Sequence, residues 1–226
     1  MRYILFGFIF ILIINGCECP PNLDTDKNYI PREASYLSII NLLDISQPTS
    51  VYSMNIQIKK LTQIQPITFQ EYFKFQSGIV DFKLTDGTIP IYNTIINTEK
   101  SEYYSILLHK RHQEIESILL FENIDKTKSN LYLKFANLSA IDKVRFVVKS
   151  NIPQNLEYNL INQGITDNIA FPSIPFTLEV HRLPTDSIVA KIENINFDLG
   201  NIAYFILVGD SINLELYQSI NKYITN

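Results

Sequence analysis

Apolar and polar residues alternate along much of the chain beyond residue 33, and this period of two indicates β-strands with one buried face. The pattern is clear at 144–148 and 176–180, and it recurs at 52–58, where Tyr, Met, Ile and Ile alternate with polar residues. Two further segments, 103–108 and 202–208, are nearly continuous apolar runs. Such runs are typical of central strands, which are covered on both faces.

The strand pattern occurs twice, which predicts an internal duplication. Residues 35–42 match residues 131–138 at an offset of 96, and the same offset relates 80–84 to 176–180. Further along, Tyr104 aligns with Tyr204 at an offset of 100. This change of offset predicts a four-residue insertion in the second copy, in a loop at 196–201.

Each copy is expected to hold about seven strands, which favours an all-β fold of two tandem β-sandwiches. The polar joint at 123–129 is short, so we expect the sandwiches to be adjacent, end to end. The best candidate for a short helical turn is Thr68 to Phe75, where Phe69, Tyr72 and Phe73 would share one face. Turn-forming residues separate the expected strands at Asp86-Gly87, Pro153-Gln154-Asn155, Pro184-Thr185-Asp186 and Gly209-Asp210.

The first residues follow a different pattern, that of a secretory signal peptide. Arg2 precedes an apolar run from Tyr3 to Ile14 that only Gly7 interrupts. As a helix this run spans about 18 Å, against roughly 30 Å for the hydrocarbon core of a bilayer. That length fits the apolar region of a signal peptide, with an uncleaved signal anchor as the alternative.

The end of this run, Ile14-Asn15-Gly16-Cys17, resembles the lipobox of bacterial lipoprotein precursors. The resemblance implies cleavage after Gly16 and a diacylglycerol thioether on Cys17. Two acyl chains convert marginal membrane binding into stable anchoring. Cys19 forms a Cys-x-Cys pair with Cys17, which could suggest a metal ligand or a strained disulfide, but the sequence has no other cysteine to complete a site. We interpret Cys19 as a free thiol, with pairing between molecules as the alternative.

These patterns divide the chain into four parts. Residues 1–16 are the expected signal peptide, and residues 17–32 are the lipidated cysteine with a polar tether. Residues 33–124 form the first sandwich repeat, and residues 128–220 form the second. The tether contains Pro20-Pro21 and lacks periodicity, as expected for a spacer or for a terminus without a role.

The charge of the chain argues against nucleic acid as a partner. The 226 residues include 19 Lys and Arg against 23 Asp and Glu, for a formal net charge of −4. Nucleic acids and anionic lipid headgroups select clusters of basic residues, and this chain is mildly acidic. The predicted contact with the membrane is therefore through the acyl chains on Cys17.

Candidate chemistry is sparse. His109, His112 and Glu114 are weak candidates for a metal site, because His and Glu at short spacing can ligate transition metals. They lie where a solvated hairpin loop is expected, beside two basic residues that would repel a cation. His181 is expected to face solvent, alone. No nucleophile elbow, zinc-protease motif or phosphate-binding loop is present, so we predict no cofactor and no enzyme activity.

Several blocks of both copies resemble bacterial envelope proteins of domain of unknown function 4397. These blocks are Asn41-Leu42 with Asn137-Leu138, Phe75-Gln76-Ser77 with Phe171-Pro172-Ser173, and the glycine-bounded strand from Leu199 to Gly209. The resemblance implies immunoglobulin-like or transthyretin-like sandwiches, anchored at the outer membrane or cell surface, without catalytic residues.

The sequence thus predicts a lipid-anchored binding or adhesion module for a protein or a glycan. A structural subunit of an envelope assembly is the alternative. A carbohydrate-active or metal-dependent enzyme is a third hypothesis, which the missing motifs disfavour.

Overall fold

The computed structural model describes residues 33–43, 49–53, 56–61, 67–86, 89–111, 114–127, 129–151 and 155–223. The expected signal peptide, Gly16, Cys17, the tether and His112 lie outside these residues. Within the described ranges the protein is all-β, as predicted, and contains no helix. No described segment is therefore a helix long and apolar enough to cross a membrane.

The described strands divide into two halves of nine each, against about seven expected per copy. The first half contains β1 (Ala34–Asn41), β2 (Thr49–Ser53), β3 (Ile56–Leu61), β4 (Ile67–Glu71), β5 (Phe73–Gln76), β6 (Gly78–Asp86), β7 (Ile89–Thr98), β8 (Tyr103–Arg111) and β9 (Glu114–Phe121). The second half contains β10 (Leu131–Asn137), β11 (Lys143–Ser150), β12 (Leu156–Ile161), β13 (Gly164–Ile165), β14 (Ile169–Phe171), β15 (Phe176–Arg182), β16 (Ser187–Ile195), β17 (Asn201–Gly209) and β18 (Leu214–Lys222).

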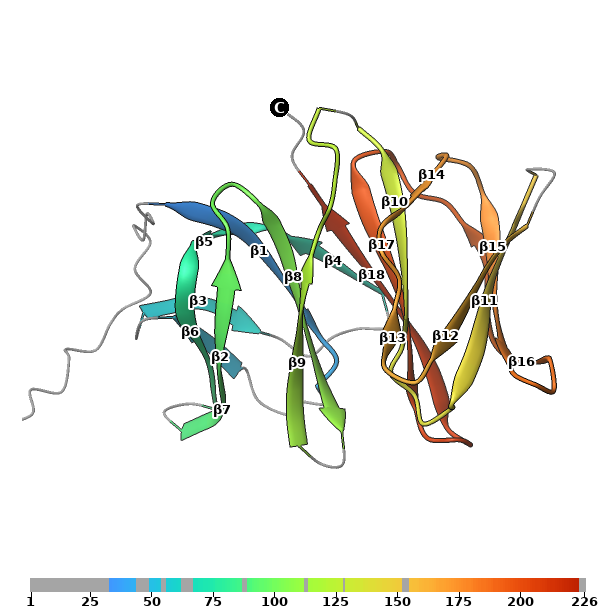
Figure 1. Cartoon of the computed structure of the whole chain (residues 1–226), viewed down its shortest axis with the longest axis horizontal. Helices are drawn as coiled ribbons and strands as arrows, with labels where there is room; N and C mark the ends of the chain where they lie inside the picture. The colour runs from blue at the N-terminus through green and yellow to red at the C-terminus, as the bar shows by residue number, and fades with distance from the viewer. Residues whose placement is uncertain are drawn as a thin grey trace, which may run out of the picture.

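The strands form four sheets that are stacked along the long axis of the molecule (Figure 1). In order, these are the first outer sheet (β3-β2-β6-β7), the first inner sheet (β5-β1-β8-β9), the second inner sheet (β13-β10-β17-β18-β4, with β14 also on β10) and the second outer sheet (β12-β11-β15-β16). The prediction of sandwiches placed end to end is wrong, because the two inner sheets lie face to face.

The two halves repeat the same topology. In each inner sheet the first strand pairs in parallel with a later one, β1 with β8 and β10 with β17. In each outer sheet two hairpins lie side by side in the same order. The predicted central strands, β8 and β17, are indeed interior to their sheets.

Strand register corrects the alignment of the two copies. Leu37 pairs with Tyr104, and its counterpart Leu133 pairs with Ala203, so the late offset is 99 and not 100. Tyr204 therefore corresponds to Ser105. The insertion has three residues and lies before the loop at 196–201. Ile96 pairs with Val80, and Ile195 pairs with Phe176, so the offset is already 99 at these two isoleucines. A wider β15–β16 hairpin and a register shift between Phe176 and Leu178 account for it.

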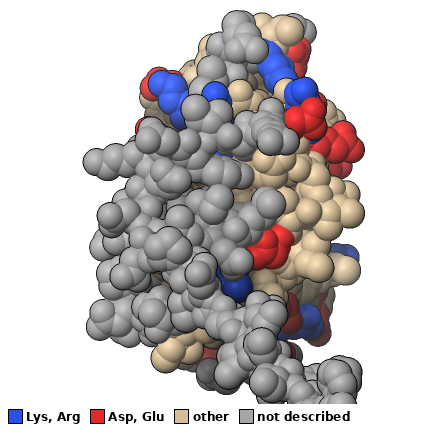
Figure 2. All heavy atoms as spheres, turned by 90° about the vertical axis from the view of Figure 1, so that its left-hand side faces the viewer, with Lys and Arg blue, Asp and Glu red and all other residues tan. Residues whose placement is uncertain are grey.

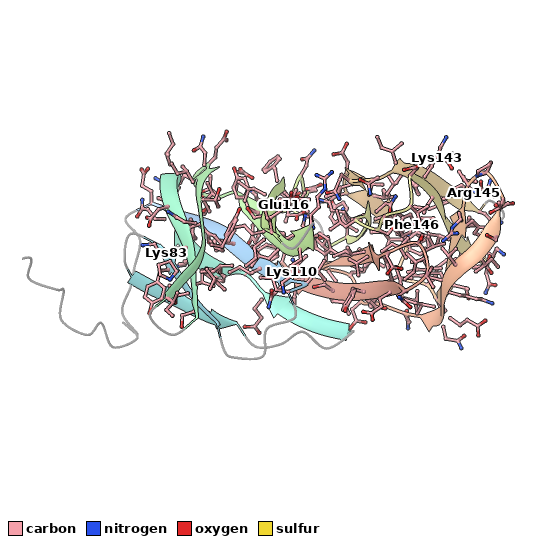
Figure 3. The ribbon with its side chains drawn as sticks, turned by 90° about the horizontal axis from the view of Figure 1, so that it is seen from below. Lys83, Lys110, Glu116, Lys143, Arg145 and Phe146 are labelled. Carbon is pink, nitrogen blue, oxygen red and sulfur yellow. The ribbon has the colours of Figure 1, made fainter. Side chains whose placement is uncertain are left out.

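Three apolar clusters fill the spaces between the layers. Figure 3 shows side chains between the sheets from below, with Phe146 inside the second half. One cluster lies in each sandwich, and alternating residues supply it, such as Phe176, Leu178 and Val180 in the second half. The third lies between the inner sheets and includes Leu107, Tyr132 and Ile206. This third cluster gives the inner sheets apolar residues on both faces, which explains the nearly continuous apolar runs.

One strand crosses from the first half to the second. β4 pairs in parallel with β18, with Phe69 opposite Ile220, and the chain then returns through Tyr72 to β5 in the first inner sheet. The predicted helical turn at Thr68 to Phe75 is therefore wrong. Phe69 and Phe73 lie in two extended strands of different sheets, and Tyr72 lies between these strands.

The expected strand at 52–58 is also interrupted. Val51 is fully buried, and β2 ends at Ser53 before the chain reverses into β3. The alternation that we interpreted as one strand therefore spans a hairpin. By contrast, the described turn at Pro184-Thr185-Asp186 connects two strands, β15 and β16, as predicted.

Figure 2 shows the end of the molecule that carries the first outer sheet. In its coloured part, acidic and basic side chains lie close together, and neither sign forms a continuous patch. This part of the surface therefore offers no basic stripe of the kind that tracks a nucleic-acid backbone.

Candidate binding cleft between the halves

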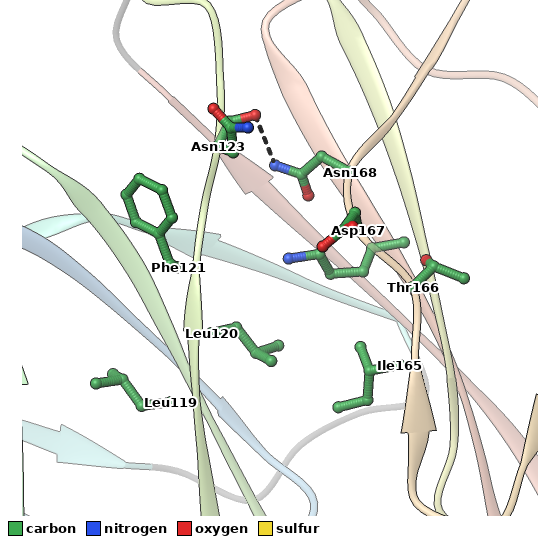
Figure 4. A pocket seen from close by; sticks show the side chains of 9 residues that line it. Leu119, Leu120, Phe121, Asn123, Ile165, Thr166, Asp167 and Asn168 are labelled. Carbon is green, nitrogen blue, oxygen red and sulfur yellow. Dashed lines mark hydrogen bonds between the residues drawn. The ribbon is translucent and has the colours of Figure 1, made fainter.

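A cleft of about 410 Å³ opens where the edge of the first inner sheet meets the second half (Figure 4). One wall is the end of β9, and the other is the segment that joins β13 to β14. Its lining residues are Leu119, Leu120, Phe121, Asn123, Lys134, Ile165, Thr166, Asp167 and Asn168. Clefts at the junction of two domains that combine apolar walls with a few polar groups are common ligand sites.

The β9 wall is apolar and belongs to a sheet edge. β9 pairs with β8 on one side, and no described strand pairs with its other side. Phe121 is 52% exposed there, and its ring lies 5.6 Å from that of Tyr104. An edge strand of this kind presents unpaired backbone N–H and C=O groups.

The opposite wall exists because the chain leaves β10 between two short strands. β13 pairs with Ala136 and Asn137, whereas β14 pairs with residues 131–133. Between them, Thr166 holds the chain to Phe135 by two hydrogen bonds: the Thr166 N–H donates to the Phe135 carbonyl (2.9 Å), and the Phe135 N–H donates to Thr166 Oγ1 (3.0 Å). Asp167, exposed, follows on the rim of the cleft.

A buried ion pair lies at the base of the cleft and joins the two halves. Lys134 on β10 donates from Nζ to Glu122 Oε2 at 2.8 Å, and the two side chains are 4% and 0% exposed. Tyr204 donates to the other carboxylate oxygen of Glu122. The Lys134 ammonium also lies 5.7 Å from the centre of the Tyr204 ring, within the range of a cation–π contact.

The hydrogen bonds continue from this pair across the interface. Tyr204 Oη lies 2.8 Å from Ser105 Oγ, which in turn accepts a hydrogen bond from Asn221 Nδ2 (3.1 Å). Burial, followed by the nearby Glu122 carboxylate, raises the pKa of Tyr204 well above its ordinary value. Tyr204 is therefore a neutral hydrogen-bond donor at any physiological pH, and the network fixes how the two inner sheets lie against each other.

The upper end of the cleft is polar. Asn168 Nδ2 donates a long hydrogen bond of 3.5 Å to the carbonyl of Asn123, from one half to the other. The Asn168 amide oxygen is buried and has no hydrogen-bond partner among the described residues. Such an acceptor costs about 1–3 kcal/mol. A hydrogen-bond donor from a ligand that reached this oxygen would remove that cost.

The predicted metal candidates do not form a site in the described structure. The predicted hairpin is present and joins β8 to β9, but only residues 112–113 separate the strands, so His109 and Glu114 lie in strands and not in a loop. The His109 side chain is buried at 4% exposure, with Nε2 3.8 Å from Glu116 Oε2. Within the described ranges, no three His, Cys, Asp or Glu side chains are grouped to hold a metal ion.

His181 faces away from the core, as predicted, but it is not a solitary solvent-facing side chain. Its Nδ1 lies 3.0 Å from Asp186 Oδ1 and its Nε2 lies 3.1 Å from Glu179 Oε2. Lys149 also binds Glu179 at 2.7 Å, and this hydrogen bond is the main reason that the pKa of Glu179 is lowered. These charges on the second outer sheet are paired with one another, which argues against a ligand site there.

Sequence patterns alone missed the residues at the base of the cleft. Lys134 is a single charge within the apolar strand 131–136, and Glu122 directly follows the apolar run 118–121. A lone charge inside a strand covered on both faces is a signal that it has a buried partner. Identifying that partner required the stacking of the inner sheets, which no local pattern encodes.

Comparison of the sequence with models of known protein families finds no match, and comparison with curated proteins finds no similar one. The resemblance to domain of unknown function 4397 therefore stays a prediction.

Proposed function

We propose that this protein is a non-catalytic binding module of the bacterial cell envelope, anchored by lipid on Cys17, which holds a protein or glycan partner in the cleft between its halves. The cleft carries this proposal. It combines an apolar sheet edge with polar groups from the second half, and the interface around it is fixed by the Lys134–Glu122 ion pair. A preformed site of this kind binds its partner without the free-energy cost of a large rearrangement.

Photo-crosslinking in intact cells tests the role of the cleft. A photoreactive phenylalanine analogue replaces Phe121 at the cleft, and the control replaces Ile188, which is 53% exposed on β16 far from it. We expect a discrete crosslinked product with the first variant that the second does not form. Equal labelling from both positions, or none from Phe121, would contradict the proposal.

The anchor is tested separately. Cys17→Ala removes the sulfur that would carry the diacylglycerol, so we expect an unprocessed precursor that incorporates no labelled fatty acid. Cys19→Ala is the matched control, and its acylation should equal that of the wild type. Normal acylation of Cys17→Ala would refute the lipobox interpretation.

A structural subunit of an envelope assembly is the second candidate. Ile79 and Ile95, on adjacent strands of the first outer sheet, are 76% and 73% exposed. Isoleucines this exposed on neighbouring strands are common at subunit contacts. Recovery of a stoichiometric complex that Ile95→Lys dissociates, with crosslinking from Phe121 absent, would favour this role over the cleft.

A further inference from the structure

In the second half, the strand equivalent to β9 carries an additional strand on its outer edge. Phe121 and Ile220 hold equivalent places, because they pair with Tyr104 and Ala203, which are themselves equivalent. β18 is thus the counterpart of β9. The free edge of β18 accepts β4 as an added parallel strand, over residues 218–222.

The equivalent stretch lies at the end of β9, where no described strand pairs with the outer edge, and the cleft lies there. Residues 218–222 correspond to residues 119–123, and four of those five residues line the cleft. The second-half counterpart of β4 is the segment 163–167. It does not cross over as β4 does, because a two-residue turn after β12 returns it to β10. It therefore faces the open β9 edge as the opposite wall.

We infer that an extended segment of a partner protein adds to β9 as a fifth strand of the first inner sheet, in the place and direction that β4 takes on β18. This inference rests on the proposed binding role of the cleft. Backbone hydrogen bonds to residues 119–123 would give affinity, as in other cases of strand addition.

The walls of the cleft define the chemistry of that segment. One face of an added strand would contact Leu120 and Ile165, which are apolar, so alternate side chains of the partner should be apolar too. The same wall carries Asp167, which is exposed at the rim of the cleft. An acidic residue beside this carboxylate would be repelled, whereas a basic or neutral one would not.

The test uses the full-length protein in detergent and a display library of random twelve-residue peptides. Peptides are selected on the wild type and then compared on Phe121→Lys, with Ile188→Lys on β16 as the matched control, because both are exposed apolar residues on edge strands. Circular dichroism and thermal unfolding establish that both variants fold. We expect selected peptides to bind Phe121→Lys at least tenfold more weakly and Ile188→Lys as tightly as the wild type.

Methylation of single backbone nitrogens in a selected peptide then identifies strand addition. An added strand directs every second N–H toward its neighbour, so binding should fall at alternate positions only. Failure to select peptides that depend on Phe121, or a scan without that alternation, overturns the inference. If photo-crosslinking from Phe121 still captures a partner or a glycan, the proposed binding role survives that result. If it captures nothing, both fall.

Discussion

His109 connects stability to pH at the scale of one residue. Burial lowers its pKa below the ordinary value of about 6.5, and Nε2 has no hydrogen-bond partner among the described residues. The unfolded chain takes up a proton near pH 6.5, whereas the folded chain takes it up only at lower pH. Stability contributed by the neutral ring is therefore present above pH 6.5 and is lost as the pH falls below it.

We expect His109→Leu to remove this acid sensitivity. Between pH 6.5 and the lowered pKa, the wild type should lose up to about 1.4 kcal/mol of unfolding free energy per pH unit relative to the variant. Urea unfolding at half-unit steps of pH measures the difference. Parallel curves for the two proteins would show that His109 does not titrate differently in the folded chain.

The Lys134–Glu122 ion pair leads to a second prediction for single residues, which concerns the free energy of unfolding. Lys134→Met leaves the Glu122 carboxylate buried without its cation, and Glu122→Gln does the reverse, so each should cost about 3–5 kcal/mol. The double variant removes both charges and should recover much of that loss. A double-mutant cycle from urea unfolding gives the coupling energy between Lys134 and Glu122, and additive losses would contradict this prediction.

His109 and Lys134 also show what the sequence cannot predict. Both lie in segments whose pattern does not indicate which neighbouring strand would bury them.

At the scale of the elements, the turn between β17 and β18 depends on a glycine. Gly209 has φ of +107°, and a Cβ there would lie 2.0 Å from the Asn213 carbonyl oxygen. Gly78 has a similar φ of +96° but open space around it. We expect Gly78→Ala to cost about 1–2 kcal/mol for its backbone conformation alone. Gly209→Ala should cost clearly more in thermal unfolding, and equal losses would show that the turn relaxes freely.

Most strands with one buried face were predicted well, because a period of two is a local property, although a hairpin interrupts the predicted strand at 52–58. The duplication was also visible from sequence, but its late offset was wrong by one residue. Aligning Tyr104 with Tyr204 matched two tyrosines that face different cores, since Tyr104 lies inside the first sandwich and Tyr204 between the inner sheets. A one-residue slip exchanges the two faces of a strand. In strands covered on both faces, composition cannot detect that slip.

At the scale of the whole molecule, we expect the four layers to unfold as one cooperative unit. The cluster between the inner sheets includes Tyr103, Tyr132 and Ile202, which would be exposed if the halves separated. We expect one calorimetric unfolding transition for the full chain, with equal calorimetric and van't Hoff enthalpies. Residues 129–223 expressed alone should aggregate, because they lack β4 and expose this apolar face. Two separate transitions, or a monomeric stable half, would contradict this.

The pairing of β4 with β18 also bears on how the chain is made. A ribosome releases residues 67–71 long before residues 214–222, and at about 5–20 residues per second the wait is roughly 8–30 s. During that interval β4 has been synthesised, but its pairing partner β18 has not. The late arrival of β18 is therefore the step that closes the molecule.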